Sequence, residues 1–161
     1  MVERVVSGGQ TGVDRAALDV ALELGYLAGG WCPRGRRAED GRIDDRYPLV
    51  ETGSPGYLER TRRNVRDSDG TLILLRGVPE GGTRMTADHA GKLGRPLFIV
   101  DFDRTARIGE VRRWLRAHGI ATLNVAGPRA SKQPAIYDDA FRFLHRLLDR
   151  RPRARSPAGQ G

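Results

Sequence analysis

The sequence predicts a three-layer α/β fold in which a mostly parallel sheet is flanked by helices. Short apolar segments alternate along the chain with amphipathic segments of helical period, which is typical of parallel sheets joined by right-handed crossovers. Three of the apolar segments run directly into glycine-rich stretches, as strands do before a tight turn. The 161 residues correspond to one domain, which we expect to span residues 1–149.

The first strand and the first helix are predicted over residues 2–7 and 12–24. The strand segment is rich in valine, and the helix segment has apolar residues at i, i+3, i+4, i+7, i+8 and i+11. We expect Thr11 to cap this helix with Asp14 three residues later, and Gly25 to end it.

The next part of the chain is irregular. Residues 29–53 have no sustained period, and so long a stretch inside a compact domain is usually functional or mobile. A helix is then expected with Ser54 as its N-cap and Pro55 at its first position. It should extend to about Arg66 and turn three residues inward: Leu58, Thr61 and Val65.

The remaining elements follow a regular alternation. The continuous apolar run 71–75 favours a strand covered on both faces of the sheet. A helix capped by Thr83 should then run to Leu93 and stop at Gly94. The other expected elements are strands over 96–100 and 121–125 and helices over 108–118 and 137–148.

The charge of the chain first favours a nucleic-acid partner. Lys and Arg number 28 against 20 Asp and Glu, a net charge of +8 with a pI near 10.7. Residues 150–161 contain four arginines and no acid, so without them 24 basic and 20 acidic residues leave +4. We expect this Arg-, Pro- and Gly-rich tail to be disordered and the domain to bind a small anion rather than nucleic acid.

Other classes of protein are disfavoured. The apolar runs are far shorter than the roughly 20 residues that span a bilayer, and the first residues show no signal-peptide pattern. The single cysteine, Cys32, excludes an internal disulfide framework and a cysteine-cluster metal site. We therefore expect a cytoplasmic protein without a membrane partner. The three histidines have no metal-ligand spacing, and no Ser/His/Asp order or other catalytic motif is present.

Three glycine-rich segments follow predicted strands, at residues 8–12, 77–83 and 126–132. In a parallel sheet their strands end at the same edge, where such sheets bind ligands. Backbone N–H groups at helix starts suit an anion, and arginine and lysine bind phosphate-like groups. The candidate binding residues are Gly8, Gly9, Gln10, Thr11 and Gly12 in the first segment with Arg15 just after it, Gly81, Gly82 and Thr83 in the second, and Arg129, Ser131 and Lys132 in the third.

Each of these features also has a plain structural interpretation. The glycine segments can be tight turns that bind nothing, and Arg129 and Lys132 can be a solvated surface pair. Arginines 60, 62, 63 and 66 either line a phosphate site or form a solvated helix face. Trp31 stacks on a heterocycle or fills the core, and Cys32 is most simply a small buried hydrophobe.

The motifs together resemble those of the molybdenum carrier and molybdenum cofactor carrier protein family. The similar segments, spread over residues 2–148, are SGGQTGVDRAALD, GGWCPRGRRAEDG, YLERTRRNVRDSDGTLIL, GGTRMTADHA and LNVAGPRASKQPAIY. The resemblance implies a Rossmann-like sheet, a homo-oligomer and a pocket at the strand ends. It also implies binding of the molybdenum cofactor (molybdopterin) or a molybdate-like or phosphate-like oxyanion, with a molybdoenzyme as recipient.

The chain is also similar to the related Lonely-Guy group, which hydrolyses nucleoside 5'-monophosphates as phosphoribohydrolases. In that group a glutamate follows the glycine loop, but Thr86 stands at the corresponding position here, and Asp88 falls on a different helical face. Without the carboxylate no group is evident that would activate water or stabilise an oxocarbenium-like transition state. A nucleotide-binding protein without catalysis is a further alternative.

Overall fold

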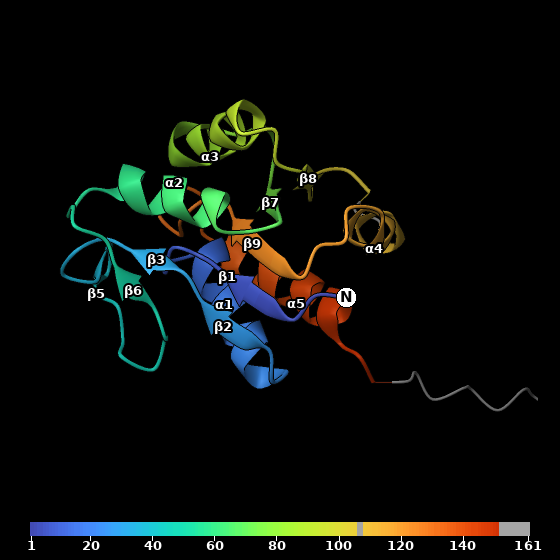
Figure 1. The fold of residues 1–161 in the computed structure, drawn as a ribbon, viewed down its shortest axis with the longest axis horizontal. Coiled ribbons are helices and arrows are strands. Elements are labelled where there is room, and N and C mark those ends of the chain that lie inside the picture. The colour runs from blue at the N-terminus through green and yellow to red at the C-terminus, as the bar shows by residue number, and fades with distance from the viewer. Residues whose placement is uncertain (106–107, 152–161) are drawn as a thin grey trace, which may run out of the picture.

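A five-stranded parallel sheet forms the centre of the protein in the computed structural model, which describes residues 1–105 and 108–151 (Figure 1). Its strands are β1 (Arg4–Val6), β2 (Leu27–Gly29), β7 (Gly70–Leu75), β8 (Leu97–Asp101) and β9 (Thr122–Ala126). The strand order is β2-β1-β9-β7-β8, and every pair is parallel. The parallel sheet predicted from the sequence is therefore confirmed.

Helices cover both faces of this sheet. They are α1 (Val13–Glu23), α2 (Tyr57–Arg66), α3 (Gly81–Lys92), α4 (Ile108–Ala117) and α5 (Ile136–Leu148). α1 packs on α5 on one face, α2 packs on α3 on the other, and α4 lies beside α5 (Figure 1). This arrangement confirms the three layers.

The main core lies around β7, whose six residues are all buried. Its apolar run is continuous because α2 and α3 cover one face of the strand while α1 and α5 cover the other. Leu72 and Leu74 pack in one cluster with Leu123 of β9 and Leu144 of α5. β8 is an edge strand, and Ile99 on it is 40% exposed.

The irregular segment 29–53 folds into four very short strands that the sequence did not predict. They are β3 (Trp31–Cys32), β4 (Arg37–Ala38), β5 (Gly41–Arg42) and β6 (Val50–Glu51). β3 pairs with β6 in parallel, and β4 pairs with β5 as an antiparallel hairpin. Two-residue strands are too short to produce a period, and the edge strand β2 escaped prediction for the same reason.

This segment has its own small core and a buried arginine. Leu18 of α1 packs there with Cys32, Ile43, Tyr47 and Leu49. The guanidinium of Arg36, which is 8% exposed, donates hydrogen bonds to four backbone carbonyls of the segment, those of Ile43, Asp44, Tyr47 and Leu49. Cys32 is fully buried, in agreement with its interpretation as a small hydrophobe.

The start of α2 was predicted wrongly. Ser54 is not its N-cap, because its hydroxyl accepts the N–H of Gly56 and the helix begins at Tyr57. Leu58 is 39% exposed, whereas Asn64 is buried and bonds both the N–H and the carbonyl of Trp31. The helix is placed by polar contacts with β3, which a search for apolar periodicity does not find.

Two predicted helix caps were also wrong. The N-cap of α1 is Gly12 rather than Thr11, and the N-cap of α3 is Glu80 rather than Thr83, with no side-chain cap in either case. The predicted ends of both helices are confirmed, because Gly25 and Gly94 follow them with positive φ.

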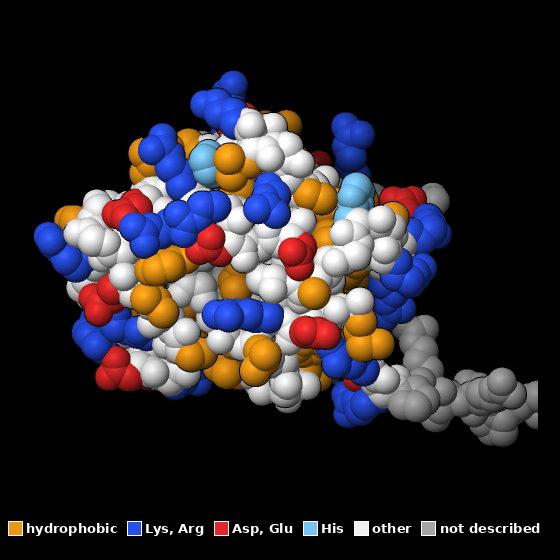
Figure 2. Space-filling view, in the orientation of Figure 1, with side chains coloured by type: hydrophobic (Ala, Val, Ile, Leu, Met, Phe, Trp, Pro, Cys, Tyr) orange, Lys and Arg blue, Asp and Glu red, His pale blue; other side chains and the backbone are white. Residues whose placement is uncertain are grey.

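Acidic and basic side chains are interspersed on the face seen in Figure 2. Of the predicted tail, residues 152–161 lie outside the described residues. Arg150 contacts the domain, with its guanidinium 4.2 Å from the centre of the Tyr26 ring, and Arg151 pairs with Asp149. Within residues 1–105 and 108–151, no helix has the length and hydropathy needed to cross a membrane.

Candidate functional site

The first glycine segment lies between β1 and α1 and contacts the third segment directly. Gly12 has a φ of +79°, and a Cβ placed on it would lie 2.4 Å from the carbonyl oxygen of Pro128. The N–H of Val13 donates to that oxygen, and the N–H of Ala130 donates to the hydroxyl of Thr11. Two of the three predicted segments therefore form one continuous surface at the carboxyl ends of β1 and β9.

A buried ion pair supports the first segment from behind. Arg60 of α2 and Asp14 of α1 are 9% and 7% exposed, and their Nη1 and Oδ2 atoms lie 3.6 Å apart. Arg60 Nη1 also donates to the carbonyl of Gly8 at 2.8 Å, and the Asp14 carboxylate accepts the N–H of Gln10. Burial raises the pKa of Asp14, and the positive charge of Arg60 opposes that rise. Arg60 is thus neither on a solvated helix face nor open to a ligand.

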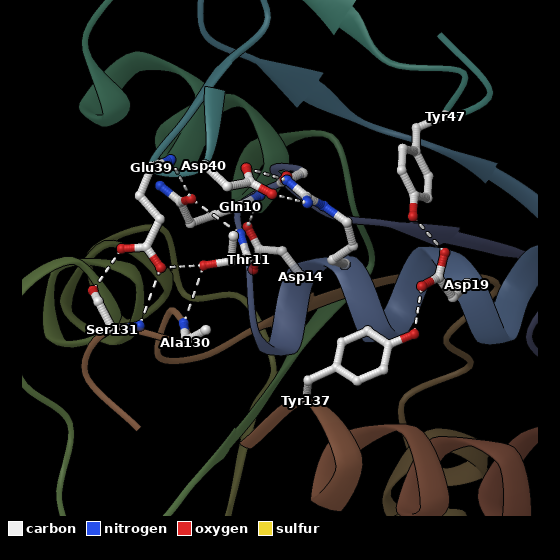
Figure 3. A network of polar contacts seen from close by, with 12 residues as sticks. Gln10, Thr11, Asp14, Asp19, Glu39, Asp40, Tyr47, Ala130, Ser131 and Tyr137 are labelled. Atoms are coloured by element: carbon white, nitrogen blue, oxygen red, sulfur yellow. Dashed lines mark hydrogen bonds and ion pairs between the residues drawn. The ribbon is translucent and has the colours of Figure 1, made fainter. Parts of the chain in front are cut away.

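Three of the predicted binding residues gather around the carboxylate of Glu39, and Figure 3 shows two of them, Thr11 and Ser131. It accepts hydrogen bonds from the Thr11 hydroxyl, from the Ser131 hydroxyl at 2.5 Å and from the Ser131 N–H at 3.1 Å. Arg129 Nε lies 3.6 Å away. The hydrogen bonds from Ser131 and Thr11 hold the pKa of Glu39 below its usual value against partial desolvation.

Two more predicted residues, Arg15 and Gln10, contact the turn between β4 and β5, which is formed by Glu39 and Asp40. The guanidinium of Arg15 holds the Asp40 carboxylate at 2.7 and 3.1 Å and also donates to the carbonyl of Gly9. The hydrogen bond from Arg15 lowers the pKa of Asp40. The side-chain oxygen of Gln10 accepts the N–H groups of Thr11 and Glu39.

A groove of about 500 Å³ lies beside these contacts. Thr11, Gly12 and Arg15 form part of its wall, and Asp19 lies further along it. The Asp19 carboxylate accepts the hydroxyls of Tyr47 at 2.6 Å and Tyr137 at 2.5 Å (Figure 3). Burial and the bond to Asp19 raise the pKa of Tyr137 above its usual value. The groove lies within the size range of small-molecule sites.

The second segment joins this surface only in part. The amide of Gln133, which follows the third segment, bonds both the N–H and the carbonyl of Arg76, which precedes the second. Among the described residues, no hydrogen bond or ion pair joins Gly81, Gly82 or Thr83 to the other two segments. Gly81 and Gly82 are exposed, and so is Lys132.

The position expected for a phosphoribohydrolase carboxylate holds a bonded hydroxyl. Thr86 is 5% exposed, and its Oγ1 donates to the carbonyl of Gly82 within α3. Asp88 is exposed, 4.0 Å from Arg84. In the part of the chain that the structure describes, no three His, Cys, Asp or Glu side chains are grouped to hold a metal ion.

Trp31 does not fill the core, because it is only partly buried and lies outside both core clusters. Its Nε1 donates to Asp67 at 2.9 Å, and the guanidinium of Arg63 lies 4.6 Å from the ring centre. The ring is therefore covered by an arginine of α2 and belongs to the packing of β3 on that helix.

The chain has a close structural relative. The 1.45 Å crystal structure of a protein from Syntrophus aciditrophicus SB, named "Putative molybdenum carrier protein", is 42% identical and has a TM-score of 0.89. The match covers 92% of this chain and 96% of that one. The structure of (E)-4-hydroxy-3-methyl-but-2-enyl diphosphate reductase is 13% identical, with a TM-score of 0.39 and coverage of 90% and 59%. No curated protein sequence matches the chain.

A family model identifies the chain over nearly all of its folded length. The model of the circularly permutated YpsA SLOG family matches residues 5–148, a range that runs from β1 to the end of α5. The three glycine segments lie within this range, and so does the β4–β5 hairpin, which contacts the first and third of them. The chain therefore belongs to the circularly permutated YpsA SLOG family.

Proposed function

We propose that this protein binds a small molybdenum-containing anion, the molybdenum cofactor or a molybdate-like oxyanion, at the joined first and third glycine segments. The observation that carries the proposal is the convergence of Thr11, Ser131 and Arg129 on one carboxylate. A phosphate or molybdate oxygen would accept hydrogen bonds from the same kinds of donor: hydroxyls, a backbone N–H and a guanidinium. The 42% identical relative, itself named a molybdenum carrier, supports molybdenum as the cargo.

The energetics require several donors to act together. A helix N-terminus contributes about 0.3–2 kcal/mol to anion binding, whereas a micromolar site needs about 8 kcal/mol. Charge-assisted hydrogen bonds add about 1.5–3 kcal/mol each, so the three side chains supply the larger share. The groove beside them offers space for the organic part of a larger ligand, such as a pterin.

The test is a binding measurement with molybdate, tungstate, phosphate and molybdenum cofactor released from a denatured molybdoenzyme. A ligand at one hundred times its Kd stabilises the folded protein by about 2.7 kcal/mol, which corresponds to a rise in melting temperature of roughly 5–10 °C. Failure of all four to shift the melting temperature would contradict the proposal. Release of free base and ribose 5-phosphate from AMP would support the phosphoribohydrolase alternative instead.

The Arg129→Gln variant is expected to bind the effective ligand about tenfold more weakly or worse. The substitution removes a positive charge and shortens the side chain, although the glutamine amide can still donate hydrogen bonds. Arg113→Gln is the matched control, because Arg113 is an exposed arginine of α4 and its loss changes the net charge equally. Isothermal titration calorimetry measures both. Equal weakening in the two variants would show that only the overall charge matters.

A homo-oligomer, a molybdoenzyme recipient and a cytoplasmic location stay predictions. A carrier must release its cargo to a recipient, so transfer can be measured by adding apo-molybdoenzyme to the loaded protein and following the activity of that enzyme. Sedimentation velocity measures the oligomeric state.

A further inference from the structure

The hairpin formed by β4 and β5 places two acidic residues, Glu39 and Asp40, across the first and third glycine segments. The two strands have two residues each, and the acidic pair forms the turn between them. In Figure 3 the Glu39 carboxylate points towards Thr11 and Ser131, and the half-exposed Asp40 carboxylate binds the Arg15 guanidinium. The hairpin tip is thus bound through negative charge to the groups that the sequence marks as anion-binding.

The Glu39 carboxylate has the contacts that a ligand oxyanion would have. Two of its donors are hydroxyls, one is the backbone N–H of Ser131, and Arg129 adds a positive charge at 3.6 Å. The donors come from segments separated by more than one hundred residues, and Glu39 itself belongs to neither. A carboxylate and a tetrahedral oxyanion compete for such donors because both present two adjacent, negatively charged oxygens.

The second acidic residue, Asp40, binds Arg15, the cation that follows the first segment. Both oxygens of Asp40 bind the Arg15 guanidinium, and the Nε of that guanidinium is buried without a hydrogen-bond partner. While the hairpin stays in this position, the Arg15 guanidinium is therefore paired with Asp40. Movement of the tip would free Arg15 together with Thr11 and Ser131.

The tip can move without unfolding the segment that carries it. The buried residues of the small core, among them Ile43 and Leu49, lie outside the hairpin, which adds only the partly buried Ala38, and Arg36 binds the carbonyls of Ile43 and Leu49. β5 is exposed along its length, and β4 is at most half-buried. An isolated two-stranded hairpin is only marginally stable, so the polar contacts of its tip decide its position.

We propose that this hairpin is a displaceable lid, and that Glu39 occupies the oxyanion subsite until the ligand's own oxyanion replaces it. The inference rests on the proposed function and adds regulation to the same site. The lid reduces the apparent affinity by the fraction of molecules in which the subsite is open. It also keeps the donors paired in the empty protein, so that ligand binding exchanges one set of charged hydrogen bonds for another.

The test compares Glu39→Gln with wild type in calorimetric titrations with molybdate and with phosphate. The amide keeps the size of the side chain but loses its charge and presents an N–H₂ group to the donors, so the closed position weakens. We expect the variant to bind at least about tenfold more tightly than wild type, as for a subsite that is open in one molecule in ten. Glu3→Gln is the control for charge, because Glu3 is exposed and lies just before β1, at the amino ends of the strands. This variant should bind as wild type does.

A second measurement does not depend on affinity. Hydrogen exchange followed by mass spectrometry should show faster exchange of residues 37–42 in Glu39→Gln without ligand, and in wild type when molybdate is added. Equal or weaker binding by Glu39→Gln, or slower exchange of the hairpin on binding, would overturn the lid while leaving the proposed function intact. If neither protein binds any probe, including the released cofactor, the proposed function itself fails and the lid fails with it.

Discussion

The Gly12→Ala variant is expected to have a free energy of unfolding about 2–6 kcal/mol below that of wild type. Gly12 has a φ of +79° and a ψ of −128°, a backbone conformation nearly confined to glycine, and a side chain there costs about 1–3 kcal/mol. Its new Cβ would also lie 2.4 Å from the carbonyl oxygen of Pro128 and 3.1 Å from the nitrogen of Ala130. These are backbone atoms that cannot rotate away, so overpacking adds about 1–3 kcal/mol.

Gly25→Ala is the comparison without a close contact. Gly25 follows the C-cap of α1 with a φ of +76°, and nothing lies within 4 Å of the Cβ that would be added. This variant should lose only the conformational part, about 1–2 kcal/mol. Urea denaturation of both variants measures the difference, which reports the close contact between the first and third segments. Equal losses would mean that the two segments can separate freely.

Gly12→Ala should also impair the proposed site in a way that Gly25→Ala does not. The contact at Pro128 brings Thr11 within hydrogen-bond distance of Ala130, and this joins the two halves of the donor set. Pushing the segments apart would disperse these donors. We therefore expect weaker molybdate binding by folded Gly12→Ala and unchanged binding by Gly25→Ala.

The fold could be predicted where the chain repeats a pattern often enough to be seen. β7 has five consecutive apolar or β-branched residues, and α1 has an apolar stripe along its whole length. The segment 29–53 has strands of two residues, and its order comes from the buried guanidinium of Arg36 and a small core. Such contacts join residues at irregular spacings, so they leave no periodic signal.

The meeting of the first and third segments at the strand ends could be predicted from the sequence, whereas the acidic residues that contact both of them could not. The rule that parallel strands end at one edge placed the first and third segments together. It could not show that, among the described residues, Gly81, Gly82 and Thr83 have no hydrogen bond or ion pair to those segments, or that Lys132 is exposed, because contacts between loops follow no periodic pattern. Glu39 and Asp40 were not predicted, because acidic residues in an irregular segment are usually solvated. Only the fold of the hairpin brings them into contact with Thr11 and Arg15.

The Arg60→Met variant is expected to lose about 3–5 kcal/mol at pH 7. Methionine fills a similar volume, but it leaves the Asp14 carboxylate buried without its cation and the Gly8 carbonyl without its donor. An uncompensated buried charge of this kind costs several kcal/mol. Arg62→Met is the control, because Arg62 is exposed on the same helix and its loss should change stability by less than about 0.5 kcal/mol.

The loss in Arg60→Met should depend on pH in a direction set by Asp14. Burial already raises the folded-state pKa of Asp14 above 3.8, and removing Arg60 takes away the charge that opposes this rise. A carboxyl whose pKa is higher in the folded state takes up a proton on folding, so its contribution to stability is lost as pH rises. The difference between variant and wild type should therefore be largest at neutral pH and shrink as pH falls towards 4.

A second substitution identifies the charge as the cause. Asp14→Asn in the Arg60→Met background removes the buried charge while it keeps an oxygen that can accept the N–H of Gln10. Most of the loss at pH 7 should be recovered, and the double variant should show little dependence on pH between 4 and 7. A loss that stays constant over this range in Arg60→Met would instead assign the role of Arg60 to its bond with Gly8 and to packing. In either case the first glycine segment is held from behind by α2 through Arg60.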